Sequence, residues 1–213
     1  MVKINNIIEI FVANIKFDLL IIPLAQTILV SRAVRKFCYE RKEAMRLANL
    51  TWPKAQEYFV KNDMVLISIG SIECHGRHMP LGTDTLIPEY LLEKIEKKSD
   101  VLIAPTIPYG SWQSLAPYPG TIDIDNEVLY QFCRQVFLSL YRHGARKFVF
   151  LNGHGGNIKM IERLGMEFED KGCLVAMLNW WLMAWDMNPA WKGGHGGGEE
   201  TAAILGIDPP LGQ

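Results

Sequence analysis

Residues 64–70 read Met-Val-Leu-Ile-Ser-Ile-Gly, a short and nearly continuous apolar run. Such a run is typical of a strand that is buried on both faces of a parallel sheet. Outward from it, strand and helix patterns alternate: the expected strands are 64–70, 101–104, 147–151 and 174–178, and the expected helices are 51–61, 84–98, 125–142 and 157–170. This alternation indicates an α/β fold, a mostly parallel sheet with helices on both faces. We expect Thr51 and Asn157 to cap the helices that follow them.

Three polar clusters accompany these strands. The first is Glu73-Cys-His75-Gly-Arg-His78-Met-Pro-Leu-Gly-Thr-Asp84, which follows the run at 64–70. The second is Asn152-Gly-His154-Gly-Gly-Asn157, which follows the run at 147–151, and the third is His195-Gly-Gly-Gly-Glu199-Glu200-Thr201. Ligands of parallel sheets gather beyond the carboxyl ends of the strands, and histidine and carboxylate bind zinc, iron or manganese. The sequence therefore predicts a metal site that activates water.

The spacing within these clusters favours convergence on one centre. In an extended segment residues two apart project to the same side, so Glu73 and His75 can reach one cation or two adjacent ones. The loop that follows can return Asp84 to the same cavity, and a carboxylate can bridge two cations. His195 lies in a glycine-rich loop, which suits a mobile acid or base, with a further metal ligand as the alternative.

Each cluster also has a purely structural interpretation. A histidine among acids is often only a surface ion pair, tandem glycines often form only a turn, and Gly-His-Gly-Gly lacks the Lys-Ser/Thr of a phosphate loop. A group of four tryptophans fits two interpretations equally well, core or subunit packing and an aromatic wall around substrate; its members are Trp180, Trp181, Trp185 and Trp191. All three clusters together favour function, because charged groups are rarely buried without purpose.

Composition narrows the class of protein. A chain of 213 residues with 49% hydrophobic content is long enough for one sizeable core. The net charge of −1 gives no reason to expect nucleic acid or an anionic membrane as a partner. The four cysteines have no CxxC spacing, which favours reduced thiols and a cytoplasmic protein over a zinc ribbon or a disulfide framework.

The N-terminal residues 1–44 differ from the rest. Their apolar stretch, residues 17–30, is shorter than the roughly 20 residues that a spanning helix needs, and Asp18, Pro23 and Gln26 interrupt it. We therefore expect an extension of uncertain role that does not cross a membrane, followed from Met45 by a single domain over residues 45–213.

The three clusters resemble the motifs of the creatininase family, over about residues 45–205. The resemblance implies a three-layer α/β/α fold with a mostly parallel sheet and a two-metal centre that hydrolyses C–N bonds in small amides. It implies that Glu73 and His75 bind separate metals and that Asp84 bridges them. His154 is implied as a further ligand and Glu200 as the fifth.

The resemblance also assigns a role to His195, which matches a histidine near the reacting amide, thought to transfer protons. The sequence departs from the family pattern in two ways, one at the second motif and one at the C-terminus. Creatinine hydrolases take a metal ligand from a glutamate where this chain has Gly156, which favours the formamidopyrimidine-nucleotide deformylase-like branch. Family members also continue further, so we expect a C-terminally short domain.

These observations lead to a functional prediction. We expect a metal-dependent amidohydrolase that acts on a small amide, formamide or cyclic amide, with zinc, iron or manganese, two cations per subunit, and a homo-oligomeric state. The alternatives are creatinine amidohydrolase proper and a metal-binding family member with impaired catalysis.

Overall fold

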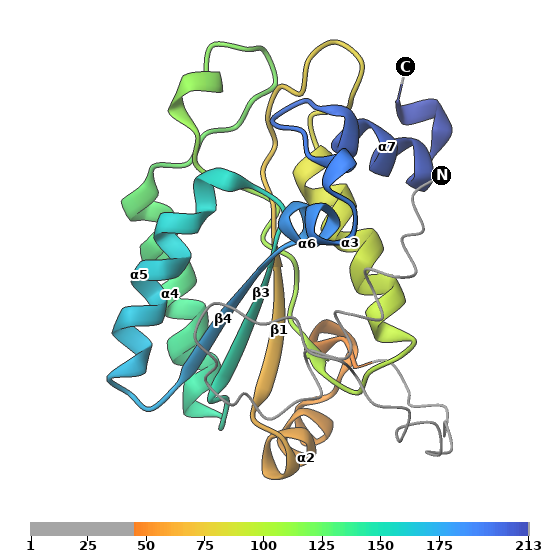
Figure 1. Ribbon diagram of the computed structural model, residues 1–213. Helices are drawn as coiled ribbons and strands as arrows, with labels where there is room; N and C mark the ends of the chain where they lie inside the picture. Colours follow the sequence, from red (N-terminus) through yellow and green to blue (C-terminus); the bar gives the residue numbers. More distant parts are fainter. Residues whose placement is uncertain (1–44, 213) are drawn as a thin grey trace.

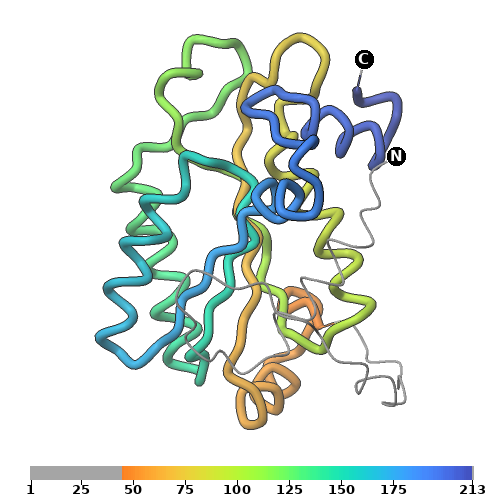
Figure 2. The backbone as a smooth tube through the Cα atoms, in the orientation of Figure 1, coloured from red at the N-terminus to blue at the C-terminus, as the bar shows by residue number. Residues whose placement is uncertain are grey.

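The computed structural model describes residues 45–212, and Figures 1 and 2 draw the other residues in grey. The expectations for residues 1–44 lie outside the described residues. Within residues 45–212, no helix is both long enough and apolar enough to cross a membrane.

The centre of the fold is a parallel sheet with strand order β2-β1-β3-β4. The strands are β1 (Met64–Ile69), β2 (Leu102–Ile103), β3 (Lys147–Asn152) and β4 (Leu174–Asn179). Their register aligns Ile69, Asn152 and Asn179 at the carboxyl ends of the three longest strands. The segments that follow β1 and β3 therefore leave the same edge of the sheet side by side, as the upper part of Figure 1 shows.

Helices cover both faces of the sheet and complete three layers (Figure 1). One face packs against α4 (Asn126–Arg142) and α5 (Ile158–Glu169). The other packs against α3 (Thr83–Glu96), α6 (Trp180–Met187) and α7 (Gly198–Ile207). The remaining α-helix, α2 (Trp52–Lys61), lies at the amino ends of the strands, and short 3-10 turns occupy Leu47–Asn49, Gln113–Leu115, Gly155–Asn157, Pro189–Trp191 and Pro209–Leu211. The expected three-layer α/β/α fold is confirmed.

Side-chain alternation along the strands divides the core into two layers. In β3, Phe148 and Phe150 face the α4–α5 layer, whereas Val149 and Leu151 face the opposite layer. Phe137 of α4 stacks on the ring of Phe148 with 4.1 Å between centroids. Because both faces of the central strands β1 and β3 are covered, these two strands read as continuous apolar runs rather than as alternating ones.

The predicted elements agree with the structure to within a few residues, but two predicted caps are wrong. Neither Thr51 nor Asn157 makes a side-chain capping hydrogen bond. The Asn157 amide instead donates to the backbone oxygen of Gly70 and to Asn152 Oδ1, because it is buried between strand ends rather than at a solvated helix terminus. Asp125 does cap α4, accepting from the backbone N–H groups of Glu127 and Val128.

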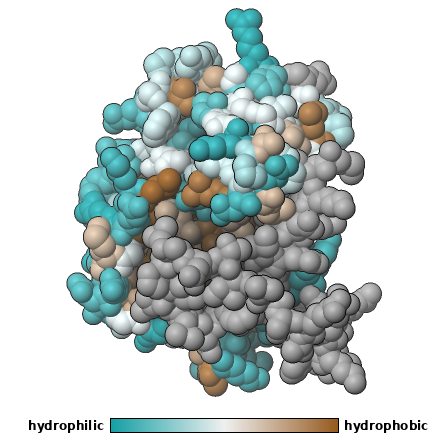
Figure 3. Space-filling model, in the orientation of Figure 1, coloured by the Kyte–Doolittle hydropathy of each residue, from teal (hydrophilic) through white to brown (hydrophobic). Residues whose placement is uncertain are grey.

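The face of the molecule in Figure 3 is mostly hydrophilic or intermediate around its upper loops, with a few separate hydrophobic patches. Isolated apolar side chains of this kind are ordinary on a protein surface.

Candidate metal centre

The predicted site residues meet at the carboxyl edge of the sheet. Glu73 and His75 lie in the segment after β1, and His154 is the second residue after β3. Asp84 is in the first turn of α3 and Glu200 in the first turn of α7, with His195 in the loop before α7. Segments separated by more than a hundred residues in sequence thus contribute side chains to one cluster.

Asp84 is at the centre of this cluster. Its Oδ1 lies 2.9 Å from His75 Nε2, and its Oδ2 lies 2.9 Å from His154 Nδ1. Glu73 Oε1 lies 3.3 Å from His154 Nδ1 and 3.3 Å from His195 Nδ1. Glu200 Oε2 lies 3.8 Å from His75 Nε2. The two oxygens of one carboxylate thus face two different imidazoles.

The three histidines share one arrangement of their rings. His75 Nδ1 donates to the backbone oxygen of Glu73 at 3.1 Å, and His195 Nε2 donates to that of Cys74 at 2.7 Å. His154 Nε2 is 3.3 Å from the backbone oxygen of Ser111. A carbonyl oxygen only accepts hydrogen bonds, so the nitrogen that faces it carries the proton. The other nitrogen of each ring is left toward the carboxylates, the orientation that metal-binding histidines adopt.

Two buried carboxylate oxygens indicate whether cations would fit this cluster. Glu73 Oε1 and Asp84 Oδ2 are buried without a hydrogen-bond partner among the described residues, although imidazole nitrogens lie close to both. Donor atoms that approach one another without hydrogen-bond geometry converge on a shared point, as ligands do around a cation. The donor set fits divalent metal.

The donors form three groups in which the atoms lie within 4.8 Å of one another. One contains Glu73, Asp84 and His154, and a second contains His75, Asp84 and Glu200. Asp84 is common to both, so these two groups are candidate positions for cations that have one carboxylate in common. The third group contains Glu73, His75 and His195, which makes His195 a possible ligand as well as a candidate proton donor.

The ionisation of the cluster without metal follows from its geometry. Burial alone would lower the pKa of both buried imidazoles, but contacts with Asp84 raise the pKa of His75 to about 9, and contacts with Asp84 and Glu73 raise that of His154 to about 10. Burial tends to raise the pKa of Asp84, but the two histidines lower it below its ordinary value. Burial and the charge of Asp84 raise the pKa of Glu200 to about 7.

These shifts predict that metal uptake releases protons. At pH 7, the metal-free chain holds protons on His75 and His154 and a partial one on Glu200, and a cation must displace them. We expect about two to three protons released per chain on full loading with zinc. Apparent affinity should rise as pH increases from 6 to 9, since fewer protons then remain to be displaced. Titration calorimetry in buffers of different ionisation enthalpy measures the number directly. Proton release near zero, with affinity independent of pH, would contradict this assignment.

Backbone packing holds Asp84 at the strand ends. A Cβ atom at Gly153 would overlap the carbonyl oxygen of Asp84, so only glycine lets the end of β3 come this close to α3. Next to it, Asn152 Nδ2 donates to Asn179 Oδ1, and the Asn152 Oδ1 atom accepts from the backbone N–H of His154. This network orients the loop that carries His154.

His78 lies outside the cluster of ionisable ligands. Its Nε2 is 3.0 Å from Thr201 Oγ1, a contact between the loop after β1 and helix α7. The first and third sequence clusters are therefore joined by a hydrogen bond as well as by the candidate metal centre.

A cavity of about 390 Å³ opens over the cluster. Trp112, Trp181 and Trp185 line it together with His195 and Glu199. The other two tryptophans of the C-terminal group, Trp180 and Trp191, line a different cavity. Trp181 and Trp185 therefore line the cavity over the cluster, whereas Trp180 is buried in the core. Trp112 was not expected at the site, because it lies in an irregular loop whose course only the folded chain reveals.

Comparison with known proteins now identifies the family. The family model described as Creatininase, creatinine amidohydrolase, matches residues 48–211. The chain belongs to the creatininase family. Among curated relatives, creatinine amidohydrolase of Pseudomonas putida is 28% identical over 194 residues, covering 78% of this chain and 72% of that protein. Mycofactocin precursor peptide peptidase of Mycolicibacterium smegmatis is 31% identical over 160 residues, which span 68% of this chain and 58% of the peptidase, less than two thirds of its length.

Solved structures agree with this assignment to the creatininase family. A crystal structure of creatinine amidohydrolase superposes with a TM-score of 0.68 at 27% identity, covering 80% of this chain and 74% of that one. Related creatininase structures include one described as a manganese form and one as a Zn-Zn type, each 27% identical over 80% of this chain, with TM-scores of 0.67 and 0.66. They cover 76% and 75% of those two chains.

Gly156 lies in the second sequence cluster, within the 3-10 turn Gly155–Asn157. A Cβ atom at this position would overlap the backbone oxygen of Ser111 and lie 2.5 Å from His154 Nε2. The backbone has no room for a glutamate here. Position 156 therefore contributes no side chain to the candidate donor groups of the described residues.

Proposed function

We propose that this protein is a metal-dependent amidohydrolase that hydrolyses a C–N bond in a small amide, formamide or cyclic amide. The observation that carries the proposal is the shared Asp84 carboxylate, with one oxygen toward His75 and the other toward His154. A carboxylate in this position is suited to bridging two divalent cations. Membership of a family with amide-hydrolysing relatives supports the same reaction class.

In the proposed mechanism, Glu73, Asp84 and His154 hold one cation, and His75, Asp84 and Glu200 hold the other. When bound, the cations would polarise the carbonyl group of the amide substrate and lower the pKa of a bound water molecule. The protein's own part is to position these donors and to exclude competing water. The hydrogen bonds from the histidine rings to backbone oxygens fix which nitrogen is free to bind.

His195 is assigned to proton transfer in this proposal. Its side chain is 46% exposed, whereas those of His75 and His154 are almost completely buried. An imidazole at the mouth of the cavity can reach a leaving nitrogen and protonate it near neutral pH. The aromatic side chains of Trp112, Trp181 and Trp185 provide flat apolar walls for the substrate.

The test is hydrolysis by the full chain under controlled metal content. The protein is stripped with a chelator, reloaded with zinc or manganese, and offered a panel of formamides, lactams and cyclic ureides that includes creatinine. We expect at least one member to be hydrolysed, with activity lost on stripping and restored on reloading. A short peptide in the panel tests the peptidase alternative that one relative suggests. No hydrolysis by fully loaded protein across the panel, or hydrolysis that persists after stripping, would contradict the proposal.

A further inference from the structure

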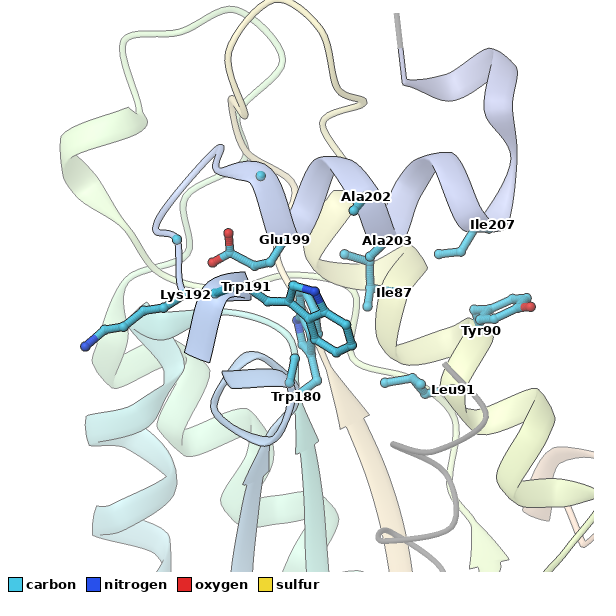
Figure 4. A pocket seen from close by; sticks show the side chains of 14 residues that line it. Ile87, Tyr90, Leu91, Trp180, Trp191, Lys192, Glu199, Ala202, Ala203 and Ile207 are labelled. Carbon is cyan, nitrogen blue, oxygen red and sulfur yellow. The ribbon is translucent and has the colours of Figure 1, made fainter. Parts of the chain in front are cut away.

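A second cavity, of about 280 Å³, lies beside the metal-centre cavity between α3, α6 and α7 (Figure 4). Its wall is mostly apolar, and the principal apolar side chains are Ile87, Leu91, Trp180, Trp191 and Ala203. A dry apolar cavity of about 150 Å³ is enough to bind benzene. This cavity can therefore hold a group of that size.

Glu199 is the carboxylate in this wall, which also includes Lys192 and Tyr90. Its residue is 8% exposed, and its Oε2 is buried with no hydrogen-bond partner among the described residues. In Figure 4 the carboxylate lies at the edge of the apolar side chains, at the start of α7. Burying a carboxylate oxygen without a hydrogen bond is unfavourable, so this oxygen can accept from a donor that a bound ligand supplies.

The lining residues do not supply that donor. Lys192 is the cation among them, and Figure 4 shows its ammonium group extending away from the cavity. Its Nζ lies 5.5 Å from the ring centroid of Trp185 instead. Glu199 is also absent from each of the donor groups that could hold a metal ion within the described residues.

Glu199 lines both cavities, the apolar one and the one over the metal centre. We propose that Glu199 and the apolar cavity form a specificity pocket for an organic cation, so that the substrate carries a positively charged nitrogen next to an apolar group. This inference rests on the proposed amidohydrolase function. Glu199 accepts the charged N–H group, a strong type of hydrogen bond, and the rings of Trp180 and Trp191 contact the apolar group.

The test compares two probes of equal shape, 2-phenylethylammonium and the neutral 2-phenylethanol. Their binding to the zinc-loaded full chain is measured by calorimetry for the wild type and for Glu199→Gln, which keeps the side-chain shape and removes the charge. We expect the ammonium probe to bind the variant at least about 10-fold more weakly, as the loss of a charged hydrogen bond implies. The alcohol should bind both proteins alike, and zinc content should not change.

A second variant, Ala203→Leu, reduces the apolar volume without touching the carboxylate. Both probes should lose affinity for it, provided that its circular dichroism matches the wild type. The inference is overturned if the ammonium probe binds wild type no tighter than the alcohol, or if Glu199→Gln weakens both probes equally. Probe binding requires no turnover, so it fails or succeeds independently of the hydrolase assay. Hydrolysis of phenylalaninamide against neutral 3-phenylpropanamide then tests whether the selectivity extends to substrate: we expect Glu199→Gln to reduce the preference for the cationic amide.

Discussion

Replacing Asp84 with asparagine should remove most of the bound zinc and lower amide hydrolysis by at least about 10³-fold, because bound cations contribute several kcal/mol of transition-state stabilisation. The substitution keeps the shape of the side chain, which is only 3% exposed, but removes the charge that both His75 and His154 face. One change therefore weakens both cation sites. Zinc content by mass spectrometry and turnover under saturating zinc are the two measurements.

Glu93→Gln is the matched control for this experiment. Glu93 is an exposed carboxylate on the same helix, α3, so its substitution changes the net charge equally without reaching the cluster. It should retain full zinc content and turnover. If Asp84→Asn kept two zinc ions per chain and wild-type turnover, Asp84 would not be the bridging ligand.

His195→Ala should lower turnover by about 10²–10⁴-fold, the usual contribution of general acid–base catalysis, while zinc stoichiometry stays unchanged. The expectation rests on the exposure of this imidazole at the cavity mouth, where it can approach a leaving nitrogen. The geometry also offers a competing role, because His195 Nδ1 lies 3.3 Å from Glu73 Oε1 within a possible ligand group. Metal content separates the two roles.

Two other histidines bracket this experiment. His154→Ala should lose zinc together with activity, because its Nδ1 faces both Glu73 and Asp84. His143 lies at the exposed C-terminal end of α4, away from the cluster. The His143→Ala variant should therefore keep wild-type zinc content and turnover. A His195→Ala protein that purifies depleted of zinc and regains full turnover with excess zinc would assign His195 to the metal instead.

The sequence was sufficient to predict the sheet and the convergence of the candidate ligands. Continuous apolar runs such as residues 64–69 indicate strands covered on both faces, and residues that follow parallel strands must emerge at one edge. Glu73 and His154 could therefore be expected to meet although they lie 81 positions apart in the sequence. Asp84 followed from a separate argument, because the loop after His75 can return it to the same cavity.

Other features could not be predicted, for identifiable physical reasons. The hydrogen-bond partners of the histidine rings are backbone oxygens, such as that of Ser111. Every residue type has a backbone oxygen, so the sequence does not indicate which residue is the partner. Glu199 Oε2 has no hydrogen-bond partner among the described residues. This depends on the side chains that surround it in the fold, which the sequence around Glu199 does not reveal. The cap predicted at Asn157 was wrong because tertiary burial offered its amide better partners than the helix did.

The close packing at Gly153 concerns the backbone of Asp84 rather than its carboxylate. It is a contact between the end of β3 and the first turn of α3. A larger residue at position 153 would push α3 away from the strand and carry Asp84 with it. The spacing between strand end and helix therefore depends on a residue that has no ionisable group of its own.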